Sequence, residues 1–322
     1  MPSADASSVT TQVDGRTLAL TNLDKPLFDT GFSKAEVIDY LLRVAPVALP
    51  HLEGRCLTRK RFPDGASADG FYEKNLPPGT PEWVARQQVL ASGTTISYPL
   101  VTGTASLAWL GNLAALEFHT PQWRVGGLTR PADHELAIDL DAEPLVLSDR
   151  LVVDLDPGEG MTMVDSSRAA MVVATELADQ GLIPFVKTSG SKGLQVFAPI
   201  HPAPWQQVVA AARGLAQTLA RRHPQVFVAV MAKQQRTDRI FVDYLQNQAA
   251  RNTIAAYSLR AKDFESVSTP LDWEEVAAVD APGALAFTAG QVLERIERGG
   301  DPWAEMLQPG TAGALPRWKL DD

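Results

Sequence analysis

The sequence has a single cysteine, Cys56, among its 322 residues, so it can form no internal disulfide and no zinc site built from several cysteines. It also lacks a long apolar run: stretches such as Ala169–Ala174 fall far short of the roughly 20 residues that cross a bilayer. The first residues are polar and do not have the basic-then-apolar order of a signal peptide. These absences predict a protein of the reducing cytoplasm without a membrane segment.

Basic residues are in the minority, with 29 Lys and Arg against 38 Asp and Glu and a net charge of −9. Taken over the whole chain, this balance argues against a protein coated with positive charge for nucleic acid. The distribution differs, because residues 221–262 hold eight Lys or Arg and only two Asp, and Arg55–Arg61 forms a second basic group. These clusters indicate anion binding only where other features require it nearby.

The composition, with 45% hydrophobic and 21% charged residues, is that of a globular chain able to bury a sizeable core. We expect a flexible leader at 1–12, a single domain at 13–300 and a C-terminal tail at 301–322. Within the domain, an N-terminal α/β subdomain is expected at about 13–130 and a catalytic core at about 150–262.

The N-terminal subdomain offers four predictable elements. Ser33-Lys34-Ala35-Glu36 is a capping box, and the apolar residues that follow at helical spacing predict a helix to about Ala45. Short strands are expected at Leu18–Leu20 and Ile96–Val101. The segment Ser106–Phe118, rich in Ala and Leu, predicts a buried helix.

The middle of the chain alternates strands and helices in the order β-α-β-β-α-β, the split βαβ pattern of ferredoxin-like folds. The expected strands are Leu151–Asp156, Ile183–Lys187, Leu194–Ala198 and Ile240–Tyr244, and the expected helices are Ser166–Asp179 and Trp205–Arg222. The predicted fold class is therefore α+β, with an antiparallel sheet in which the first strand lies between the fourth and the third.

Three acidic residues converge in this topology. Asp154 and Asp156 are two apart on one strand, so their side chains leave the same face, and Asp243 lies on the neighbouring strand. Carboxylates crowded into one volume are costly to bury unless cations neutralise them. Mg²⁺ and Mn²⁺ take such oxygen ligands, and two ions about 4 Å apart stabilise phosphoryl transfer. The alternative, surface aspartates at a strand end, is disfavoured by the position of Asp243.

The segment Thr188–Gly193, with sequence TSGSKG, is expected at the same end of the sheet. Backbone amides of such a turn form an anion-binding concavity, and its hydroxyls and lysine add donors, although the spacing is not that of a Walker A loop. An ordinary hairpin turn is the alternative. Arg260 and His119 are further candidate phosphate ligands, each with a structural alternative as a surface charge or a core histidine.

A second Asp-Leu-Asp triplet, Asp139-Leu140-Asp141, lacks the Pro-Gly-Glu-Gly continuation that follows Asp156. It belongs to no assignable phosphate turn. We expect an exposed insertion strand or hairpin there.

Several segments together resemble a known family. They are Val152–Gly160, Thr188–Gly193, Phe241–Asp243 with Gln246-Asn247, and Tyr257–Arg260, supported by Thr21–Lys25, Arg59–Gly65 and Glu73–Pro77. This ordered set resembles the polymerase domain of bacterial DNA ligase D, in the archaeo-eukaryotic primase superfamily, from about Val13 to Arg298. Because no Lys-x-Asp-Gly adenylation motif occurs, the chain also resembles the stand-alone actinobacterial primase-polymerases of the Prim-PolC kind, which work with separate ligases.

The resemblance implies a template-directed nucleotidyltransferase that adds nucleoside triphosphates, ribonucleotides by preference, to a primer 3′-hydroxyl. Its substrates would be gapped or broken duplex DNA with a 5′-phosphate and NTP or dNTP, in DNA repair. It implies two divalent cations, Mn²⁺ or Mg²⁺, on Asp154, Asp156 and Asp243. A separate ATP-dependent ligase and Ku are the implied partners of a monomer acting at the bacterial nucleoid.

The resemblance also assigns binding residues. The triphosphate would be held by His119, Ser189, Lys192 and Arg260, with Arg236, Gln246 and Lys60 close by in the nucleotide pocket. The downstream 5′-phosphate would be bound by Asn22, Lys25 and Lys34. Phe71 and Tyr72 occupy the position of an aromatic pair that stacks on the template base, and Arg61 would contact the template backbone.

Two other functions stay open from the sequence. The triplet Asp154-Leu155-Asp156 also resembles that of aspartate-dependent phosphohydrolases of the haloacid dehalogenase type, although that family has Thr or Val at the position of Gly158 and a parallel, doubly wound sheet. The other is a non-catalytic adaptor that binds DNA ends and recruits a ligase, for which Asp243 would be dispensable.

Overall fold

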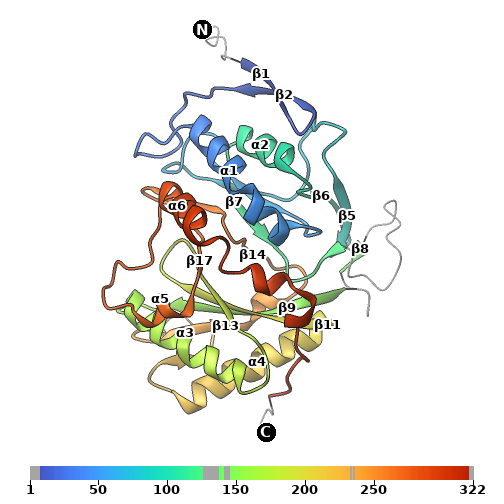
Figure 1. Cartoon of the computed structure of the whole chain (residues 1–322). Helices are drawn as coiled ribbons and strands as arrows, with labels where there is room; N and C mark the ends of the chain where they lie inside the picture. The colour runs from blue at the N-terminus through green and yellow to red at the C-terminus, as the bar shows by residue number, and fades with distance from the viewer. Residues whose placement is uncertain (1–7, 126–137, 141–145, 233, 235, 319–322) are drawn as a thin grey trace.

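The structure is a computed structural model that describes residues 8–125, 138–140, 146–232, 234 and 236–318. An N-terminal half with three small sheets lies against one face of a larger sheet in the C-terminal half (Figure 1). The two halves share a hydrophobic core, because Val152 and Phe197 of the larger sheet are buried together with Tyr40 and Leu116 of the N-terminal half.

The larger sheet has six strands in the order β12-β13-β9-β11-β10-β17. They are β9 (Leu147–Pro157), β10 (Phe185–Thr188), β11 (Leu194–Pro204), β12 (Phe227–Val228), β13 (Ile240–Asp243) and β17 (Pro270–Leu271). All pairings are antiparallel except that of β12 with β13. The predicted order of the four core strands is confirmed, and β12 and β17 extend the sheet at its two edges. This antiparallel arrangement contradicts the doubly wound parallel sheet of the phosphohydrolase alternative.

Helices α3 (Met163–Ala178) and α4 (Trp205–Arg222) cover one face of this sheet (Figure 1). Leu151, Val153 and Leu155 of β9 are buried among the apolar residues of these helices. Since side chains alternate along a strand, Val152, Asp154 and the other even-numbered residues face the opposite way, toward the N-terminal half. The alternation thereby directs the acidic residues into the space between the halves.

The N-terminal half contains helices α1 (Lys34–Leu52) and α2 (Thr104–Asn112) and several strands. Its strands are β1 (Ser8–Val13), β2 (Arg16–Thr21), β3 (Thr58–Arg61), β4 (Phe71–Glu73), β5 (Arg86–Ala91), β6 (Thr94–Pro99), β7 (Ala115–Thr120) and β8 (Ile138–Asp139). Strand β14 (Thr253–Ile254) returns from the C-terminal half and completes the sheet β14-β7-β3-β4. Among the described residues, no helix is both long and apolar enough to traverse a bilayer.

The last part of the chain packs over the junction of the halves. It contains β15 (Leu259–Ala261), β16 (Glu265–Val267), α5 (Trp273–Ala277), α6 (Ala289–Gly299) and the 3₁₀ helices η4 (Ala304–Leu307) and η5 (Pro309–Thr311). Trp303 lies in the segment expected as a tail, yet its ring is buried 5.2 Å from that of Phe197 and its Nε1 donates to the Val186 carbonyl. Trp303 is therefore part of the core.

Three predictions about the bounds or type of an element differ from the structure. Residues 8–12, expected in the leader, belong to β1, which pairs with β2 over six residues. Helix α1 continues past Ala45 through Pro46 and Pro50 to Leu52, because Ala48, His51 and Leu52 are buried on its inner side and that burial outweighs the missing helix hydrogen bonds.

The third difference is Ser106–Phe118, which is not one helix. Helix α2 ends at Asn112, Ala114 adopts a left-handed φ of 54°, and the chain continues as strand β7. All six residues of β7 are buried, so the strand has no exposed face that would give it a regular apolar-polar alternation. Its residues, with Ala and Leu at the start, continue the composition of the helix before it.

The second acidic triplet also differs from its prediction. Asp139 ends β8, a two-residue strand that pairs in parallel with β5, and the flanking Ile138 and Leu140 are buried rather than exposed. Asp141 lies outside the described residues.

Candidate active site

Three carboxylates meet on adjacent strands, as the sequence predicts. Asp154 of β9 lies directly opposite Asp243 of β13, and Asp156 follows on the same face of β9. Each side chain offers an oxygen, and these oxygens all lie within 4.8 Å of one another. The arrangement concentrates three negative charges in a volume of a few ångströms.

Burial and the crowding of the carboxylates raise the pKa values of two of them. Burial and the nearby charge of Asp156 raise the pKa of Asp154 to about 7, although a hydrogen bond from Gln195 opposes the shift. Burial and Asp243 also raise the pKa of Asp156. The carboxylates repel one another and are short of positive charge. Their all-oxygen donor set therefore fits a hard divalent cation.

Neighbouring amides fix the carboxylates in place. Gln195 Nε2 donates to Asp154 Oδ1 over 2.9 Å, and Gln246 Nε2 donates to Asp243 Oδ2 over 2.9 Å. The amide of Gln195 is itself held by Lys187, whose buried Nζ donates to Gln195 Oε1 and to Ser268 Oγ, each over 2.6 Å. The sequence gives no sign of this role for Lys187 and Gln195, because both lie within strands whose pattern indicates only a buried core.

A cavity of about 450 Å³ opens beside the acids. Its lining includes nine residues singled out from the sequence: Tyr72, His119, Asp154, Asp156, Ser189, Lys192, Arg236, Gln246 and Arg260. Ser191 of the predicted anion-binding turn lines it too, and so do Gln195 and Asn252, which were not predicted. Segments distant in sequence thus surround one space in which cationic side chains face carboxylates.

The turn between β10 and β11 differs from the expected amide cradle. The amide of Gly190 donates to the Thr188 hydroxyl, and those of Ser191 and Gly193 donate to the Ser189 hydroxyl over 3.3 and 3.2 Å. Because these amides are used within the turn, the groups it offers to the cavity are mainly the side chains of Ser189, Ser191 and Lys192.

The predicted aromatic pair is split between two faces of β4. Tyr72 lines the cavity, and its ring centre is 5.4 Å from that of His119 and 5.4 Å from Lys60 Nζ. Phe71 points to the other face and lies against the guanidinium of Arg61, at 5.4 Å. Both rings are largely exposed. Lys60 therefore lies next to the cavity, whereas Arg61 lies away from it and pairs with Glu73.

The three residues predicted for a 5′-phosphate gather at the start of α1. Lys34 is buried, and its Nζ donates to the Thr21 carbonyl over 2.7 Å. The carbonyl of Asn22 accepts from the Lys25 amide, and Lys25 Nζ donates to the Pro63 carbonyl over 2.5 Å. Burial and the charges of Lys25 and Arg61 lower the pKa of Lys34 to about 8, and Lys25 also forms an ion pair with the exposed Asp64 over 3.6 Å.

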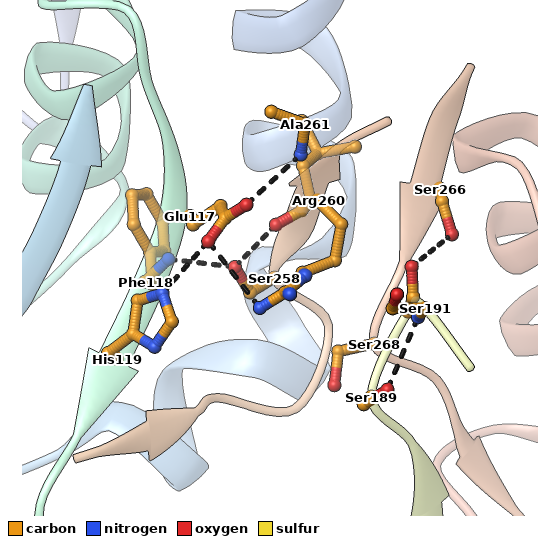
Figure 2. Close-up of polar contacts among 12 residues, drawn as sticks. Glu117, Phe118, His119, Ser189, Ser191, Ser258, Arg260, Ala261, Ser266 and Ser268 are labelled. Carbon is orange, nitrogen blue, oxygen red and sulfur yellow. Dashed lines mark hydrogen bonds and ion pairs between the residues drawn. The ribbon is translucent and has the colours of Figure 1, made fainter. Parts of the chain in front are cut away.

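A further residue of the site lies on β7, in the segment that the sequence predicts to be a helix. Glu117 is buried two positions before His119 on β7, and its Oε2 lies 3.0 Å from His119 Nε2 and 3.5 Å from Arg260 Nη1 (Figure 2). The alternation of Glu117 and His119 with Leu116 and Phe118 was the sequence signal that would have found it.

A carboxylate cluster on the antiparallel sheet of a split βαβ fold, next to a cationic cavity, is the arrangement expected for a protein of the primase-polymerase class. Comparison with known proteins agrees with this class. The family described as "LigD, primase-polymerase domain" matches residues 33–303. The chain therefore belongs to the LigD primase-polymerase domain family.

Relatives and a solved structure show how far the similarity extends. The chain is 39% identical over 286 residues to the "Multifunctional non-homologous end joining protein LigD" of Mycobacterium bovis, covering 88% of this chain and 36% of that protein. It is 28% identical over 294 residues to the "Bifunctional non-homologous end joining protein LigD" of Bacillus subtilis, covering 90% of this chain and 44% of that protein. It thus spans less than half of the length of each of these relatives.

The structural similarity is equally extensive. The structure of the "Polymerase Domain from Mycobacterium tuberculosis Ligase D in complex with DNA" matches with a TM-score of 0.83 and 38% identity, over 90% of this chain and 98% of that one. The fold predicted from the sequence is confirmed by this match.

Proposed function

We propose that this protein is a template-directed polymerase that adds nucleotides, ribonucleotides by preference, to a primer 3′-hydroxyl at short gaps or breaks in DNA. The observation that carries the proposal is the trio Asp154, Asp156 and Asp243, gathered on adjacent strands beside a cationic cavity. The family name and the DNA-bound structural match support it.

The acidic trio would hold two divalent cations, Mn²⁺ or Mg²⁺. Bound there, the cations would lower the pKa of the attacking hydroxyl and neutralise charge on the leaving pyrophosphate. Gln195 and Gln246 keep the carboxylates of Asp154 and Asp243 oriented toward the common volume. The protein thus supplies a fixed anionic socket, so little reorganisation is needed when the reaction begins.

The incoming triphosphate would lie in the cavity. Ser189, Lys192, His119 and Arg260 would contact phosphate oxygens, with Arg236 and Gln246 nearby. The guanidinium of Arg236 is stacked on Phe241 at 3.7 Å, which limits its movement. Tyr72, with Lys60 beside it, would stack on a template base, a contact that tolerates every base identity. Phe71 and Arg61, on the other face of β4, would meet the template further along.

The downstream strand would place its 5′-phosphate among Asn22, Lys25 and Lys34. A buried ammonium close to two other cations gains from an anionic ligand. Gapped or broken DNA would be joined afterwards by a separate ATP-dependent ligase, with Ku at double-strand ends, in the nucleoid of a bacterial cell. The relatives are named for end joining, which supports a role in DNA repair.

Primer extension on a duplex with a one-nucleotide gap tests the proposal. We expect extension by one nucleotide with Mn²⁺ or Mg²⁺, complementary to the template, faster with a ribonucleotide and with a 5′-phosphate across the gap. Extension should weaken as salt rises, because phosphate contacts release counterions. Absence of extension with either metal and all nucleotides would contradict the proposal.

The preference for a 5′-phosphate should depend on pH. Because the pKa of Lys34 is lowered to about 8, its ammonium is charged at pH 7 and largely neutral at pH 9. The affinity ratio of phosphorylated to hydroxyl gaps should therefore fall by up to about tenfold per pH unit above the pKa of Lys34. A Lys34→Arg variant is the control, because guanidinium does not titrate in this range. An equal fall in both proteins would contradict the assignment.

A further inference from the structure

Glu117 is not among the residues predicted to bind the triphosphate, yet it contacts two of them, His119 and Arg260. Its buried carboxylate accepts from His119 Nε2 over 3.0 Å and lies 3.5 Å from Arg260 Nη1 (Figure 2). The other oxygen accepts from the Ala261 amide over 3.3 Å. One side chain of β7 therefore holds both a ring on its own strand and a guanidinium on β15.

The contact fixes which nitrogen of His119 can meet a ligand. A carboxylate accepts hydrogen bonds, so Nε2 carries the hydrogen shared with Glu117 and Nδ1 is the nitrogen left over. His119 lines the cavity, which makes Nδ1 its group for a bound ligand. Burial lowers the pKa of His119, and the charge of Glu117 opposes that shift. Glu117 thereby stabilises the imidazolium form, in which Nε2 donates to Glu117 and Nδ1 can donate to a bound anion.

Arg260 is held in place but is not saturated. Its ion pair with Glu117 is long, and its Nε is buried and has no hydrogen-bond partner in the described part of the chain. The Thr188–Gly193 turn packs on the aliphatic part of the Arg260 side chain, because a Cβ on Gly190 would lie 2.4 Å from Arg260 Cγ. The guanidinium thus lies between Glu117 and the turn, with donor capacity left for an anion.

Glu117 itself is stable in this position because both neighbours are cationic or can become so. Burial pushes the pKa of Glu117 upward, but the hydrogen bond with His119 and the charge of Arg260 outweigh it, and the pKa is lowered. A buried carboxylate deprived of these partners would be costly. The three groups therefore form one unit, in which Glu117 sets the spacing of the other two.

We propose that Glu117 is a positioning residue for the incoming nucleotide: it holds His119 and Arg260 so that both face the same phosphate group of the triphosphate. This inference rests on the proposed function, because it takes the cavity to be the triphosphate site. The residue acts through its two neighbours and makes no contact with the nucleotide.

The test is a comparison of Glu117→Gln with the wild type on gapped DNA. Loss of a charged hydrogen-bond partner should raise the KM for the nucleotide about tenfold to a hundredfold. The kcat should change by less than about threefold, because the acids that hold the cations are untouched. Glu297→Gln, an exposed glutamate paired with Arg43, is the matched control and should keep the wild-type KM.

A double-mutant cycle separates positioning from a general loss of structure. If Glu117 acts through His119, Glu117→Gln should raise KM by a smaller factor in the His119→Gln variant than in the wild type, and the remaining factor is the part that acts through Arg260. Without nucleotide, ring ¹⁵N shifts should show Nε2 of His119 protonated in the wild type and a mixture of tautomers in Glu117→Gln, and bound nucleotide should protonate Nδ1 as well in the wild type. Should Glu117→Gln fail to fold, Glu117→Asp keeps the charge, shortens the reach and should also raise KM.

The outcomes distinguish this inference from the proposed function. Wild-type extension with an unchanged KM in the folded Glu117 variants, or effects of Glu117 and His119 that multiply independently, would overturn the positioning role alone. A wild type that fails to extend any primer would overturn the proposed function.

Discussion

Changing Asp243 to asparagine is expected to lower the rate of primer extension about a thousandfold or more, which corresponds to at least about 4 kcal/mol of transition-state stabilisation. The substitution keeps the shape of the side chain and removes one of three charges that would hold the cations. Because Asp243 lies opposite Asp154, the remaining two acids cannot enclose the same volume.

The measurement is single-turnover extension on gapped DNA, together with the affinity for that DNA. DNA affinity should stay within about threefold of the wild type, since the variant leaves the cationic residues in place. Asp139→Asn, in the second Asp-Leu-Asp triplet, is the matched control and should extend normally. Retention of more than about a tenth of the wild-type rate in Asp243→Asn would contradict the metal site. Repair that is unaffected in cells carrying this variant would favour the adaptor alternative.

Replacing Gly158 by alanine is expected to destabilise the protein by about 2–3 kcal/mol and to impair extension. A Cβ at this position would lie 1.8 Å from the Arg236 carbonyl oxygen and 2.8 Å from that of Arg239. Both contacts are with backbone, so the end of β9 and the facing loop must separate. Arg236 lines the cavity, and the separation would move it away from its position there.

Urea denaturation and extension assays check this expectation. Gly290→Ala is the control, because Gly290 lies in α6, where an added Cβ would have no neighbouring atom within 4 Å, and alanine favours a helix by up to about 1 kcal/mol. The control should be equal to or more stable than the wild type. If Gly158→Ala is as stable as the wild type, the loop that begins at Arg236 can move away without loss of stability, and the prediction is wrong.

Much of the catalytic half could be predicted because its local signals agree with one another. Strand β9 is a β-branched run that ends in acids, α4 begins and ends at Trp205 and Arg222 as expected, and the split βαβ order determines which strands are neighbours. That order makes the strands of Asp154 and Asp243 neighbours, and the register then places the two residues opposite each other. This is why a site assembled from distant segments was visible in a single sequence.

The parts that could not be predicted depend on tertiary contacts rather than on local sequence patterns. Strand β7 has a helical composition, and its place in the sheet comes from pairing with β3 and with β14, which returns from more than a hundred residues later. Because this segment was expected to be part of a helix, Glu117 was not assigned to the site. Lys187 similarly gains its role only from the approach of Ser268 and Gln195. Tertiary pairing of this kind overrides local propensity.

Binding of Mn²⁺ tests the central claim most directly, and electron paramagnetic resonance counts the bound ions. In the presence of nucleotide and gapped DNA, the wild type should bind two Mn²⁺ per chain, and Asp243→Asn should lose at least one at the same free concentration. Equal Mn²⁺ binding by the two proteins would place the cations elsewhere and contradict the account.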